Sequence, residues 1–400
     1  MAISGAPSLI ELFVPDKVDP NLVNPEISIV VPALNEELTI GEFIDWCWKG
    51  LSDAGVAGEI IIVDSSSDDT PNIALSKGAK VLRTPKRGLG QAYIDSIPYI
   101  QGKFVIMGDC DLTYDFRDLR FFVDSYLNGS EYVMGSRFKG FIEDNAMPKL
   151  HRYFGTPLTT WILNRIYSSK FSDIHCGMRG ITKNALIKIN LSSTGWEYAS
   201  EMVLKAKRYG LVIDEVPVKF YKDREGRFSH HRRAGFWSPW YAGWVNLKVM
   251  LTYGSEMLLI KPGVLMAIFG LLISFLCTLG GVTVLGVGFN TYMHLLGVVL
   301  FTLGLSIFQV GLLGGDFHGM PEKYERIRKI SDLSYNNGML IAFGSIFFGL
   351  LLEIGFVVDY IQNGFEAKNF GHGAINGFLL LITGVQIFSF VLLLELKRRR

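Results

Sequence analysis

The chain has 400 residues, of which 49% are hydrophobic, and its 39 Lys and Arg against 38 Asp and Glu leave a formal charge of +1. This length allows two or three domains. The nearly equal numbers of positive and negative charges give no indication of a nucleic-acid partner. The four cysteines, at positions 47, 110, 176 and 277, have no CxxC spacing, which excludes a metal–thiolate centre.

Charge and hydropathy divide the chain into unlike parts. Residues 1–235 are rich in charge, whereas residues 256–396 are dominated by Leu, Ile, Phe, Val and Gly. The N-terminal residues have spaced prolines and lack the basic start and apolar core of a signal peptide, so we expect an extended lead-in. The expected organisation is an N-terminal extension at 1–25, an α/β domain at 26–232, juxtamembrane amphipathic helices at 233–258, a four-helix membrane domain at 259–396 and a basic tail at 397–400.

Strands and helices alternate in the first half of the α/β domain. Apolar runs predict strands at 26–34, 58–66, 80–85 and 103–109, and amphipathic patterns predict helices at 36–51, 68–78 and 88–99. Further along, residues 149–168 and 195–210 read as helices and 211–223 as strand–Pro–strand. This alternation is typical of a Rossmann-like, mostly parallel α/β sheet. No GxGxxG follows the first strand, so a dinucleotide-binding fingerprint is absent.

Unusual polar residues follow three of the predicted strands, at Pro32–Glu36, Asp64–Ser67 and Asp109–Asp111. In such sheets ligands bind beyond the carboxyl ends of the strands. Asp109 and Asp111 point to the same side of an extended chain, and two carboxylates offer hard-oxygen ligands for Mg²⁺ or Mn²⁺. We expect Asp115, in "YDFRDL", to cap the helix that follows.

Two further turns suit a nucleotide with its phosphates. Asp64 can accept hydrogen bonds from a base or ribose, while the alternative for this loop is helix capping by Asp68 or Asp69. The turn "KRGLG", Lys86 to Gly90, combines cations with glycines that permit close approach of the backbone to phosphate, although it could equally be a plain basic turn.

Four apolar stretches come near the ~20 residues that a membrane-spanning helix needs. They cover residues 260–286, 291–315, 337–358 and 373–395, and their alternative is a set of buried helices in a soluble domain. Basic residues lie in the loop at 323–329 and at the C-terminus, which the positive-inside rule places in the cytoplasm. An even number of spans then puts the α/β domain there too, in a multi-pass integral membrane protein.

A basic and aromatic segment links the two parts. It contains Arg224, Arg227, His230, His231, Arg232, Arg233, Phe236, Trp237, Trp240, Tyr241 and Trp244. This composition favours the headgroup layer of a bilayer, and the alternative is an ordinary aromatic core helix.

Six motifs occur in the order of a known family. They are "VPALNEE", "IIVDSSSDDT", "GDCDLTYDF", "MGSRFKG", "DIHCGMRG" and "EVPVKFY". Over residues 26–235 the set resembles family 2 of the inverting GT-A glycosyltransferases, and more closely the polyprenyl-phosphate glycosyltransferases, such as dolichol-phosphate mannose synthases and dolichol-phosphate glucose synthetase-like proteins. The resemblance implies transfer of one hexose from a nucleotide sugar to a polyprenyl phosphate at the lipid bilayer, with Mg²⁺ or Mn²⁺ as cofactor.

The resemblance also implies roles for particular residues. The expected nucleotide-sugar contacts are Pro32, Ala33, Asn35, Glu36, Asp64 and Asp109, joined by Lys86 and Gly88 of the basic turn. The expected metal ligands are Asp109 and Asp111, and the expected lipid-phosphate contacts are Arg137, Arg179, Arg224 and Ser229. The expected catalytic residues are Asp111, Arg137, Asp173 and Glu201.

Some of these roles have alternatives. Asp173 matches a proposed base in relatives, but a lipid phosphate is already anionic and needs little activation, so Asp173 could instead orient an arginine or His175. Glu201 could form an i,i+4 pair with Lys205. Ser65 stands where many relatives have a second acid, which leaves a two-carboxylate contact in this loop open.

Other functions are compatible with parts of the sequence. A processive polysaccharide synthase usually has a QxxRW motif after the catalytic acid, and none follows Glu201. A transporter with a regulatory domain would spread polar residues through several spans, whereas these spans are mostly aliphatic and aromatic. The relatives favour UDP-glucose first and GDP-mannose second as donor, and whether the chain forms a homo-oligomer stays open.

Overall fold

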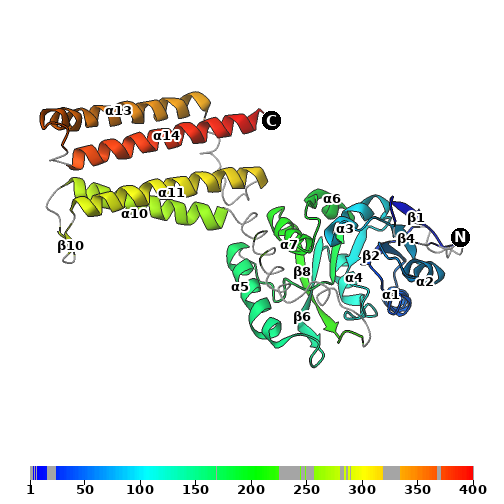
Figure 1. Cartoon of the computed structure of the whole chain (residues 1–400). Helices are drawn as coiled ribbons and strands as arrows, with labels where there is room; N and C mark the ends of the chain where they lie inside the picture. The colour runs from blue at the N-terminus through cyan, green and yellow to red at the C-terminus, as the bar shows by residue number, and fades with distance from the viewer. Residues whose placement is uncertain are drawn as a thin grey trace. The chain divides into compact units, whose positions relative to one another are not determined.

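The computed structural model of the chain describes residues 3, 5, 7–15, 24–167, 169–224, 244, 248, 256–279, 283–284, 287–288, 290–318, 334–366 and 371–399. The chain divides into two compact units, Met1–Met250 and Leu251–Arg400, and each is described by itself. Figure 1 shows the first unit as a sheet covered by helices and the second as a group of long helices.

The first unit is built on an eight-stranded sheet with the order β1-β4-β3-β2-β5-β7-β6-β8. The strands are β1 (Glu11–Phe13), β2 (Ile27–Ala33), β3 (Gly58–Asp64), β4 (Lys80–Arg83), β5 (Phe104–Met107), β6 (Tyr132–Ile142), β7 (Arg179–Thr182) and β8 (Ile213–Phe220). The parallel order β4-β3-β2-β5 confirms the strands predicted from the alternating pattern. The rest of the sheet is mixed, because β7 runs antiparallel to both β5 and β6, while β6 and β8 are parallel.

The helices of the first unit are α1 (Ile40–Asp53), α2 (Thr70–Ser76), α3 (Leu89–Ser96), α4 (Arg120–Leu127), α5 (Thr156–Tyr167), α6 (Lys183–Ile189) and α7 (Tyr198–Arg208). Helices lie at the places predicted for α1, α2, α3, α5 and α7, and α6 is a helix that was not predicted. A π-helical turn, His151–Gly155, precedes α5. The predicted strand–Pro–strand at 211–223 is one strand, β8, because an edge strand tolerates a proline that cannot donate a hydrogen bond.

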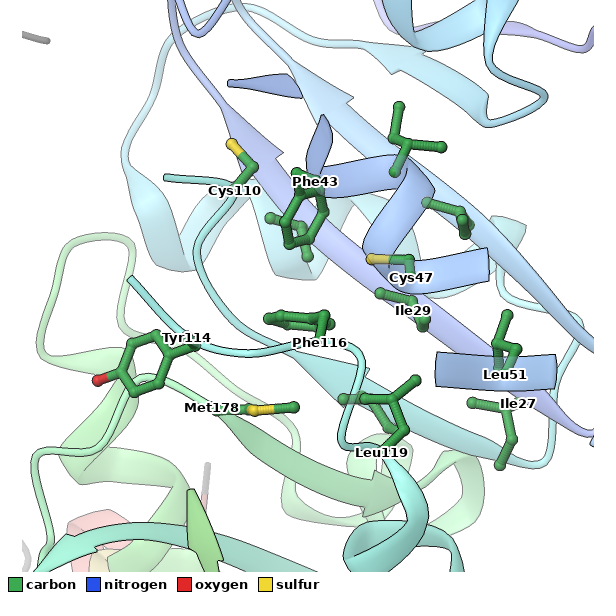
Figure 2. Close-up of a cluster of buried hydrophobic side chains, with 14 of the residues drawn as sticks. Ile27, Ile29, Phe43, Cys47, Leu51, Cys110, Tyr114, Phe116, Leu119 and Met178 are labelled. Atoms are coloured by element: carbon green, nitrogen blue, oxygen red, sulfur yellow. The ribbon is translucent and has the colours of Figure 1, made fainter. Parts of the chain in front are cut away.

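The main core lies between the sheet and α1 (Figure 2). Phe43, Cys47 and Leu51 recur every four residues on α1, so they share the face that is fully or almost fully buried. The ring of Phe43 meets that of Phe116 edge-on at 4.8 Å between centroids. Phe116 comes from the loop after β5. Its burial in the core therefore also fixes the segment that follows Asp109 and Asp111.

The expected N-terminal lead-in is tied to the sheet. β1 pairs antiparallel with β4 at the edge. The backbone N–H of Ile3 donates to Asn72 Oδ1 at 2.9 Å, and Asn72 Nδ2 donates back to the Ile3 carbonyl at 3.0 Å. These contacts anchor the described residues of the extension to α2 and to the sheet edge.

The second unit contains four long apolar helices among the residues that the structure describes. They are α10 (Lys261–Thr278), α11 (Thr291–His318), α13 (Tyr335–Gln362) and α14 (His372–Arg398). Their candidate membrane spans are Leu258–Thr278, Thr291–Gly314, Tyr335–Gln362 and His372–Arg398. The prediction that the first span reaches residue 286 is wrong: the helix ends at Thr278, and Thr283–Val284 pairs antiparallel with Val287–Gly288. β-Branched residues among glycines favour this short ribbon over a helix.

Small residues let α10 and α11 pack closely. A Cβ added at Gly270 would lie 2.3 Å from the backbone N of Phe301 and 2.6 Å from the carbonyl O of Gly297. Polar groups also join helices: Asn376 Nδ2 on α14 donates to Thr278 Oγ1 at 3.1 Å, and His294 Nε2 on α11 lies 3.1 Å from Asn376 Oδ1. Both devices are common between membrane helices.

Some expectations fall on residues outside those described. Within the expected juxtamembrane helices at 233–258, the structure describes Trp244, Lys248 and 256–258. The basic loop at 323–329 and Ser229 are also outside the described residues. At the C-terminus, α14 continues through Lys397 and Arg398, so these basic residues form the last helical turn.

The close contact of α10 with α11 predicts that Gly270→Ala destabilises the second unit. The added methyl overlaps the backbone of α11, and overpacking of this kind costs about 1–3 kcal/mol. The matched control is Gly355→Ala in α13, where a Cβ meets nothing within 4 Å among the described residues. Thermal unfolding of the purified chain in detergent checks this, and equal unfolding temperatures for the two variants would contradict the close packing.

Candidate functional site

Strand register brings the candidate residues to one edge of the sheet. Met107 at the end of β5 pairs with Arg179 of β7, which pairs in turn with Met134 of β6. Since β5 and β6 are both antiparallel to β7, they run in the same direction. The residues after Met107, those after Met134 and those just before Arg179 therefore converge. Asp64, which ends β3 beside Ala33 of β2, lies at the same edge.

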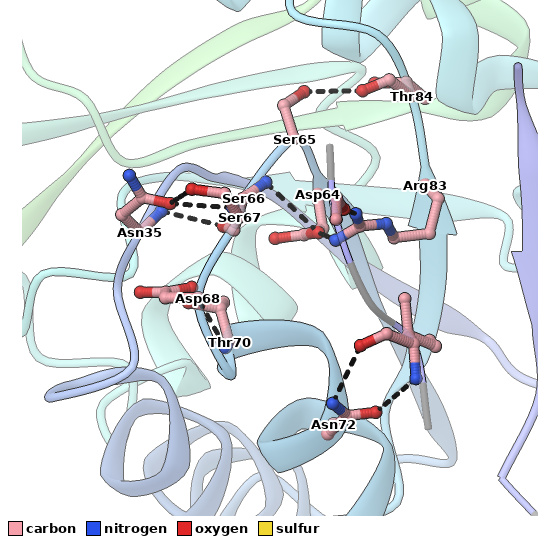
Figure 3. Close-up of polar contacts among 12 residues, drawn as sticks. Asn35, Asp64, Ser65, Ser66, Ser67, Asp68, Thr70, Asn72, Arg83 and Thr84 are labelled. Atoms are coloured by element: carbon pink, nitrogen blue, oxygen red, sulfur yellow. Dashed lines mark hydrogen bonds and ion pairs between the residues drawn. The ribbon is translucent and has the colours of Figure 1, made fainter. Parts of the chain in front are cut away.

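The loop after β2 is bonded to the loop after β3 (Figure 3). The Asn35 N–H donates to Ser66 Oγ at 2.7 Å, and the Ser67 N–H donates to Asn35 Oδ1 at 2.9 Å. Asn35 has a φ of 56°, a left-handed conformation that asparagine tolerates well. The N–H of Glu36, a buried residue, donates to Thr70 Oγ1 at 2.9 Å. The two loops therefore form one connected wall.

The backbone of Pro32 and Ala33 supports the same wall. The Ser65 N–H donates to the Ala33 carbonyl at 3.1 Å, and Cys110 Sγ lies 3.5 Å from the Pro32 carbonyl oxygen. The N-cap position of α2 is Asp69, which makes no side-chain capping bond, while Asp68 Oδ1 accepts a hydrogen bond from the N–H of Thr70, the first residue of α2, at 3.1 Å.

Asp64 is fully buried and ion-paired with Arg83 (Figure 3). Its Oδ2 accepts from the Arg83 guanidinium and from the Ser66 N–H, whereas its Oδ1 has no hydrogen-bond partner among the described residues. Burial raises the pKa of the Asp64 carboxyl above its usual value, although Ser66 and Arg83 act in the opposite direction. An acceptor atom held without a partner suits a ligand that can donate a hydrogen bond.

Sequence reasoning missed Arg83 as the partner of Asp64. The two residues are in register at the ends of neighbouring strands β3 and β4. The signal was present in "IIIVD" and "KVLR", which place an acid and a base at the last position of consecutive predicted strands.

Asp109 and Asp111 are both half-buried in the loop after β5. Asp111 Oδ1 accepts from the N–H and the hydroxyl of Thr113, at 3.0 and 2.6 Å, so the carboxylate orientation is fixed. Leu112, which lies between Asp111 and Thr113, has a φ of 64°, a strained conformation for a bulky residue. Asp109 Oδ2 lies against Gly177, where a Cβ would come within 2.7 Å of it.

This donor set fits a hard divalent cation. Magnesium typically takes one or two carboxylates and completes its shell with phosphate oxygens and water. The described residues contain no group of three or more His, Cys, Asp or Glu placed as metal ligands.

Asp115 has a different role from the one expected. It lies five residues before α4, whose N-cap position is Leu119, so the predicted capping is wrong. Its carboxylate accepts from Arg117 Nε at 2.7 Å and from the Tyr221 hydroxyl at 2.9 Å. Burial alone would raise the pKa of Asp115, but Arg117 and Tyr221 outweigh it and lower the pKa.

Arg137 and Asp173 form a buried, two-bond ion pair. Arg137 Nε lies 2.6 Å from Asp173 Oδ2, and Arg137 Nη2 lies 2.9 Å from Asp173 Oδ1. Arg137 is 8% exposed and Asp173 is fully buried. Burial alone would raise the pKa of Asp173, but the hydrogen bonds and charge of Arg137 hold that pKa below its usual value. The alternative role of Asp173, as an acid that orients an arginine, therefore matches this geometry.

Glu215 on β8 binds the loop that carries Asp173, and this role was not predicted from the sequence. Its Oε1 accepts hydrogen bonds from the N–H groups of Ser172 and Asp173, at 2.8 and 3.2 Å. His175 lies beyond, with its Nε2 2.8 Å from Thr159 Oγ1 of α5. Burial lowers the pKa of His175 to about 4, so this imidazole is neutral at physiological pH.

The structure corrects the expected role of Arg179. This side chain is fully buried, and its guanidinium donates to the carbonyl oxygens of Cys176, Ile174 and Ala199. An arginine whose donors are bound to backbone inside the core is not placed to hold a lipid phosphate. Arg179 instead fixes the loop that carries Asp173.

The structure also corrects the expected role of Glu201. It is fully buried, accepts a hydrogen bond from the Ser193 N–H at 2.7 Å and pairs with Lys205 at 2.6 Å, which confirms the i,i+4 alternative. Burial alone would raise the pKa of Glu201, but Lys205 and Ser193 outweigh it and lower the pKa to about 2. Glu201 is thus a positioning residue rather than a catalytic one.

The loop that Glu201 holds supports the basic turn at Lys86–Gly90. The Gln91 N–H donates to the Thr194 carbonyl at 3.0 Å. Gly88 has a φ of 118°, and a Cβ there would lie 2.2 Å from the Thr194 oxygen, so the turn requires glycine. Lys86 is exposed on this turn.

Arg224 lies elsewhere in the first unit. It is half-exposed, and its Nη1 lies 2.8 Å from Glu42 Oε2 on α1. The structure therefore groups Asn35, Asp64, Asp109, Asp111, Arg137 and Asp173 at one edge and gives no contact between this group and Arg224 among the described residues.

The chain is similar to several characterised or named proteins. It is 31% identical over 375 residues to the low-salt glycan biosynthesis hexosyltransferase Agl6 of Haloferax volcanii, covering 91% of this chain and 87% of the relative. It is 29% identical over 205 residues to a dolichyl-phosphate hexose transferase of the same organism, covering 50% of this chain and 85% of the relative. A solved structure of glucosyl-3-phosphoglycerate synthase from Mycobacterium tuberculosis has 22% identity, a TM-score of 0.44 and covers 58% of this chain and 81% of its own.

Two family models match different parts of the chain. Residues 28–189 match glycosyl transferase family 2, and residues 313–397 match the glycosyltransferase family 2 C-terminal transmembrane region. The first match contains the whole group at the sheet edge, and the second contains α13 and all but the last residue of α14. Together with the full-length relative, these matches show that the chain is an integral membrane glycosyltransferase and belongs to glycosyl transferase family 2.

Proposed function

We propose that the protein transfers one hexose from a nucleotide sugar to a polyprenyl phosphate, with inversion at the sugar and with Mg²⁺ or Mn²⁺ bound. The observation that carries this proposal is the shared sheet edge, where Asp64, the Asp109–Asp111 pair and Arg137 converge. The site thus has an acceptor atom for a nucleoside, two carboxylates for a cation and a guanidinium for a phosphate.

The donor half of the site neutralises a leaving diphosphate. Asp109 and Asp111 would hold the cation, and a bound divalent cation stabilises the negative charge that develops on the leaving nucleoside diphosphate. Asp111 is preorganised for this by its two bonds to Thr113. The glycines of the Lys86–Gly90 turn keep the backbone free of side chains beside the exposed cation of Lys86.

The acceptor half of the site needs a positively charged side chain more than it needs a general base. A phosphate monoester is already anionic at neutral pH, so it attacks the sugar without prior loss of a proton. Asp173 has both oxygens bound to Arg137 and a pKa below its usual value, which makes it a weak base. Its role in this proposal is to present Arg137 to the acceptor phosphate.

Relatives support the class of acceptor and leave the sugar to experiment. One relative is named a dolichyl-phosphate hexose transferase and another a glycan biosynthesis hexosyltransferase. UDP-glucose is the first candidate donor and GDP-mannose the second. Basic residues in the loop at 323–329 and at the C-terminus support a cytoplasmic first unit and C-terminus.

Radiolabelled UDP- and GDP-sugars, incubated with the purified chain and polyprenyl phosphate, test this function. The proposal expects label that extracts into organic solvent, requires Mg²⁺ or Mn²⁺ and amounts to one sugar per lipid. Long water-soluble polymer would support a processive synthase instead, and no transfer from any donor would overturn both assignments.

Asp111→Asn should abolish transfer while the chain remains folded. The substitution keeps the size of the side chain and removes the charge that binds the cation, so kcat/KM should fall at least about 100-fold. Asp118→Asn in the same loop, which removes a surface pair with Lys219, is the matched control and should keep its metal dependence. Unchanged activity of Asp111→Asn at limiting metal would sink the metal assignment.

Asp173→Asn should raise the KM for the lipid phosphate about 10-fold, with little change in the KM for the donor. The charge-assisted bonds that orient Arg137 are lost, and such bonds contribute about 1.5–3 kcal/mol each. Steady-state kinetics at several pH values separate this role from general-base catalysis. A base would instead show a fall in kcat of about 10²–10⁴ with both KM values unchanged.

Asp173→Asn could also destabilise the fold, because it leaves the buried Arg137 charge unpaired. Donor-dependent thermal stabilisation, measured in parallel, shows that the nucleotide half of the site is intact.

A further inference from the structure

A long segment of the first unit carries no acidic residue. Between Asp144 and Asp173 the sequence has no Asp or Glu, and it contains Lys149, Arg152 and, further along, Arg165 and Lys170. This run, residues 145–172, is called the α5 segment here because it includes the π-helical turn His151–Gly155 and α5. Its uniform positive charge is unusual in a chain whose overall charge is close to zero.

The α5 segment also turns an apolar stripe to the outside. The exposed fractions are 65% for Leu150, 71% for Tyr153, 61% for Phe154, 41% for Leu158 and 63% for Trp161. These positions recur every three or four residues, so they lie on one face of the helix.

The opposite face of the helix packs against the domain. Leu163 is fully buried, and Thr156 and Thr160 are 5% exposed. The inward face therefore mixes leucine with threonines, and the outward face carries large apolar side chains where a surface helix usually carries polar ones. A contiguous exposed apolar surface of this kind marks an interaction site.

We propose that the exposed face of the α5 segment docks on the headgroup layer of an anionic lipid bilayer. The chain carries four candidate membrane spans, so its first unit is held close to a bilayer in any case. Tyr and Trp favour the interface between headgroups and acyl chains. The acid-free run of Lys and Arg complements the negative charge of anionic lipids, which argues for the bilayer over a neutral protein surface.

Docking at this face would act on the acceptor half of the site, called the acceptor corner here, which contains Arg137 and Asp173. Thr159 Oγ1 on α5 lies 2.8 Å from His175 Nε2, and Thr160 Oγ1 accepts from the Ile174 N–H at 3.5 Å. Both partners belong to the loop that carries Asp173. The orientation of α5 on the lipid surface is therefore transmitted to the ion pair that presents Arg137.

A groove runs beside the same helix. Its volume is about 390 Å³, and it is lined by Phe138, Pro157, Thr160, Trp161, Asn164, Phe171 and Ser172. Phe138 follows Arg137 and Ser172 precedes Asp173, so the groove borders the acceptor corner. Docking of α5 would set this groove at the level of lipid headgroups. The docking itself depends on the membrane anchorage of the chain and not on which sugar or acceptor is used.

A pair of spin-labelled variants of the full chain tests the docking. Leu158→Cys places a nitroxide on the exposed face of α5, and Phe121→Cys places one on α4 as the matched control, since the native side chains are 41% and 42% exposed. The four native cysteines are buried, which limits background labelling. The chain is reconstituted in nanodiscs of phosphatidylcholine with phosphatidylglycerol, and collisions with oxygen and with a neutral nickel chelate are measured.

We expect the label at 158 to collide more with oxygen and less with the nickel chelate than the label at 121. Equal exposure of both labels to the nickel chelate would overturn the proposal. Shielding at 158 that is the same in detergent and grows with protein concentration would identify a second copy of the chain as the occupant, and would also overturn it.

Charge reversal tests the attraction between the basic residues of the α5 segment and anionic lipid. Reversing two charges, with Lys149→Glu and Arg152→Glu in the Leu158→Cys background, should lose the shielding that phosphatidylglycerol adds. Shielding that stays the same after charge reversal, or that is the same without phosphatidylglycerol, would show that the basic residues do not bind the anionic lipid.

Discussion

The buried ion pair of Arg137 and Asp173 connects the parts of the site. It joins β6, which carries Arg137, to the loop before β7, which carries Asp173. Two charges removed from water are costly unless each meets the other with good geometry, and here both carboxylate oxygens are engaged. Glu215 fixes one side of that loop and Arg179 the other. Without this pair, the buried Arg137 guanidinium would lose the two bonds that fix its orientation.

The sheet explains why so few residues suffice for the proposed chemistry. Strands β3, β5 and β6 bring an acid, a pair of acids and an arginine to the same edge, and each side chain is held by neighbours: Arg83 for Asp64, Thr113 for Asp111 and Asp173 for Arg137. A preorganised site of this kind needs little rearrangement when charge develops during transfer.

Much of the first half of the domain was predictable from sequence. The strands up to β5 are short apolar runs bounded by turn residues, and their carboxyl ends carry the polar residues that mark the site. Side-chain burial was not predictable, because it depends on how distant elements pack. Arg179 and Glu201 are charged residues with expected roles in the site, yet both are fully buried and bind backbone groups. The antiparallel placement of β7 between β5 and β6 is likewise a property of the whole sheet.

In the proposed reaction, the acceptor half of the site selects a phosphate by its charge. The direct measurement is kcat/KM of the full-length chain in nanodiscs for a polyprenyl phosphate and for the matching polyprenol without phosphate. One charge-assisted hydrogen bond contributes about 1.5–3 kcal/mol, so we expect a preference of about 10- to 100-fold for the phosphate. Equal values for the two lipids would contradict it.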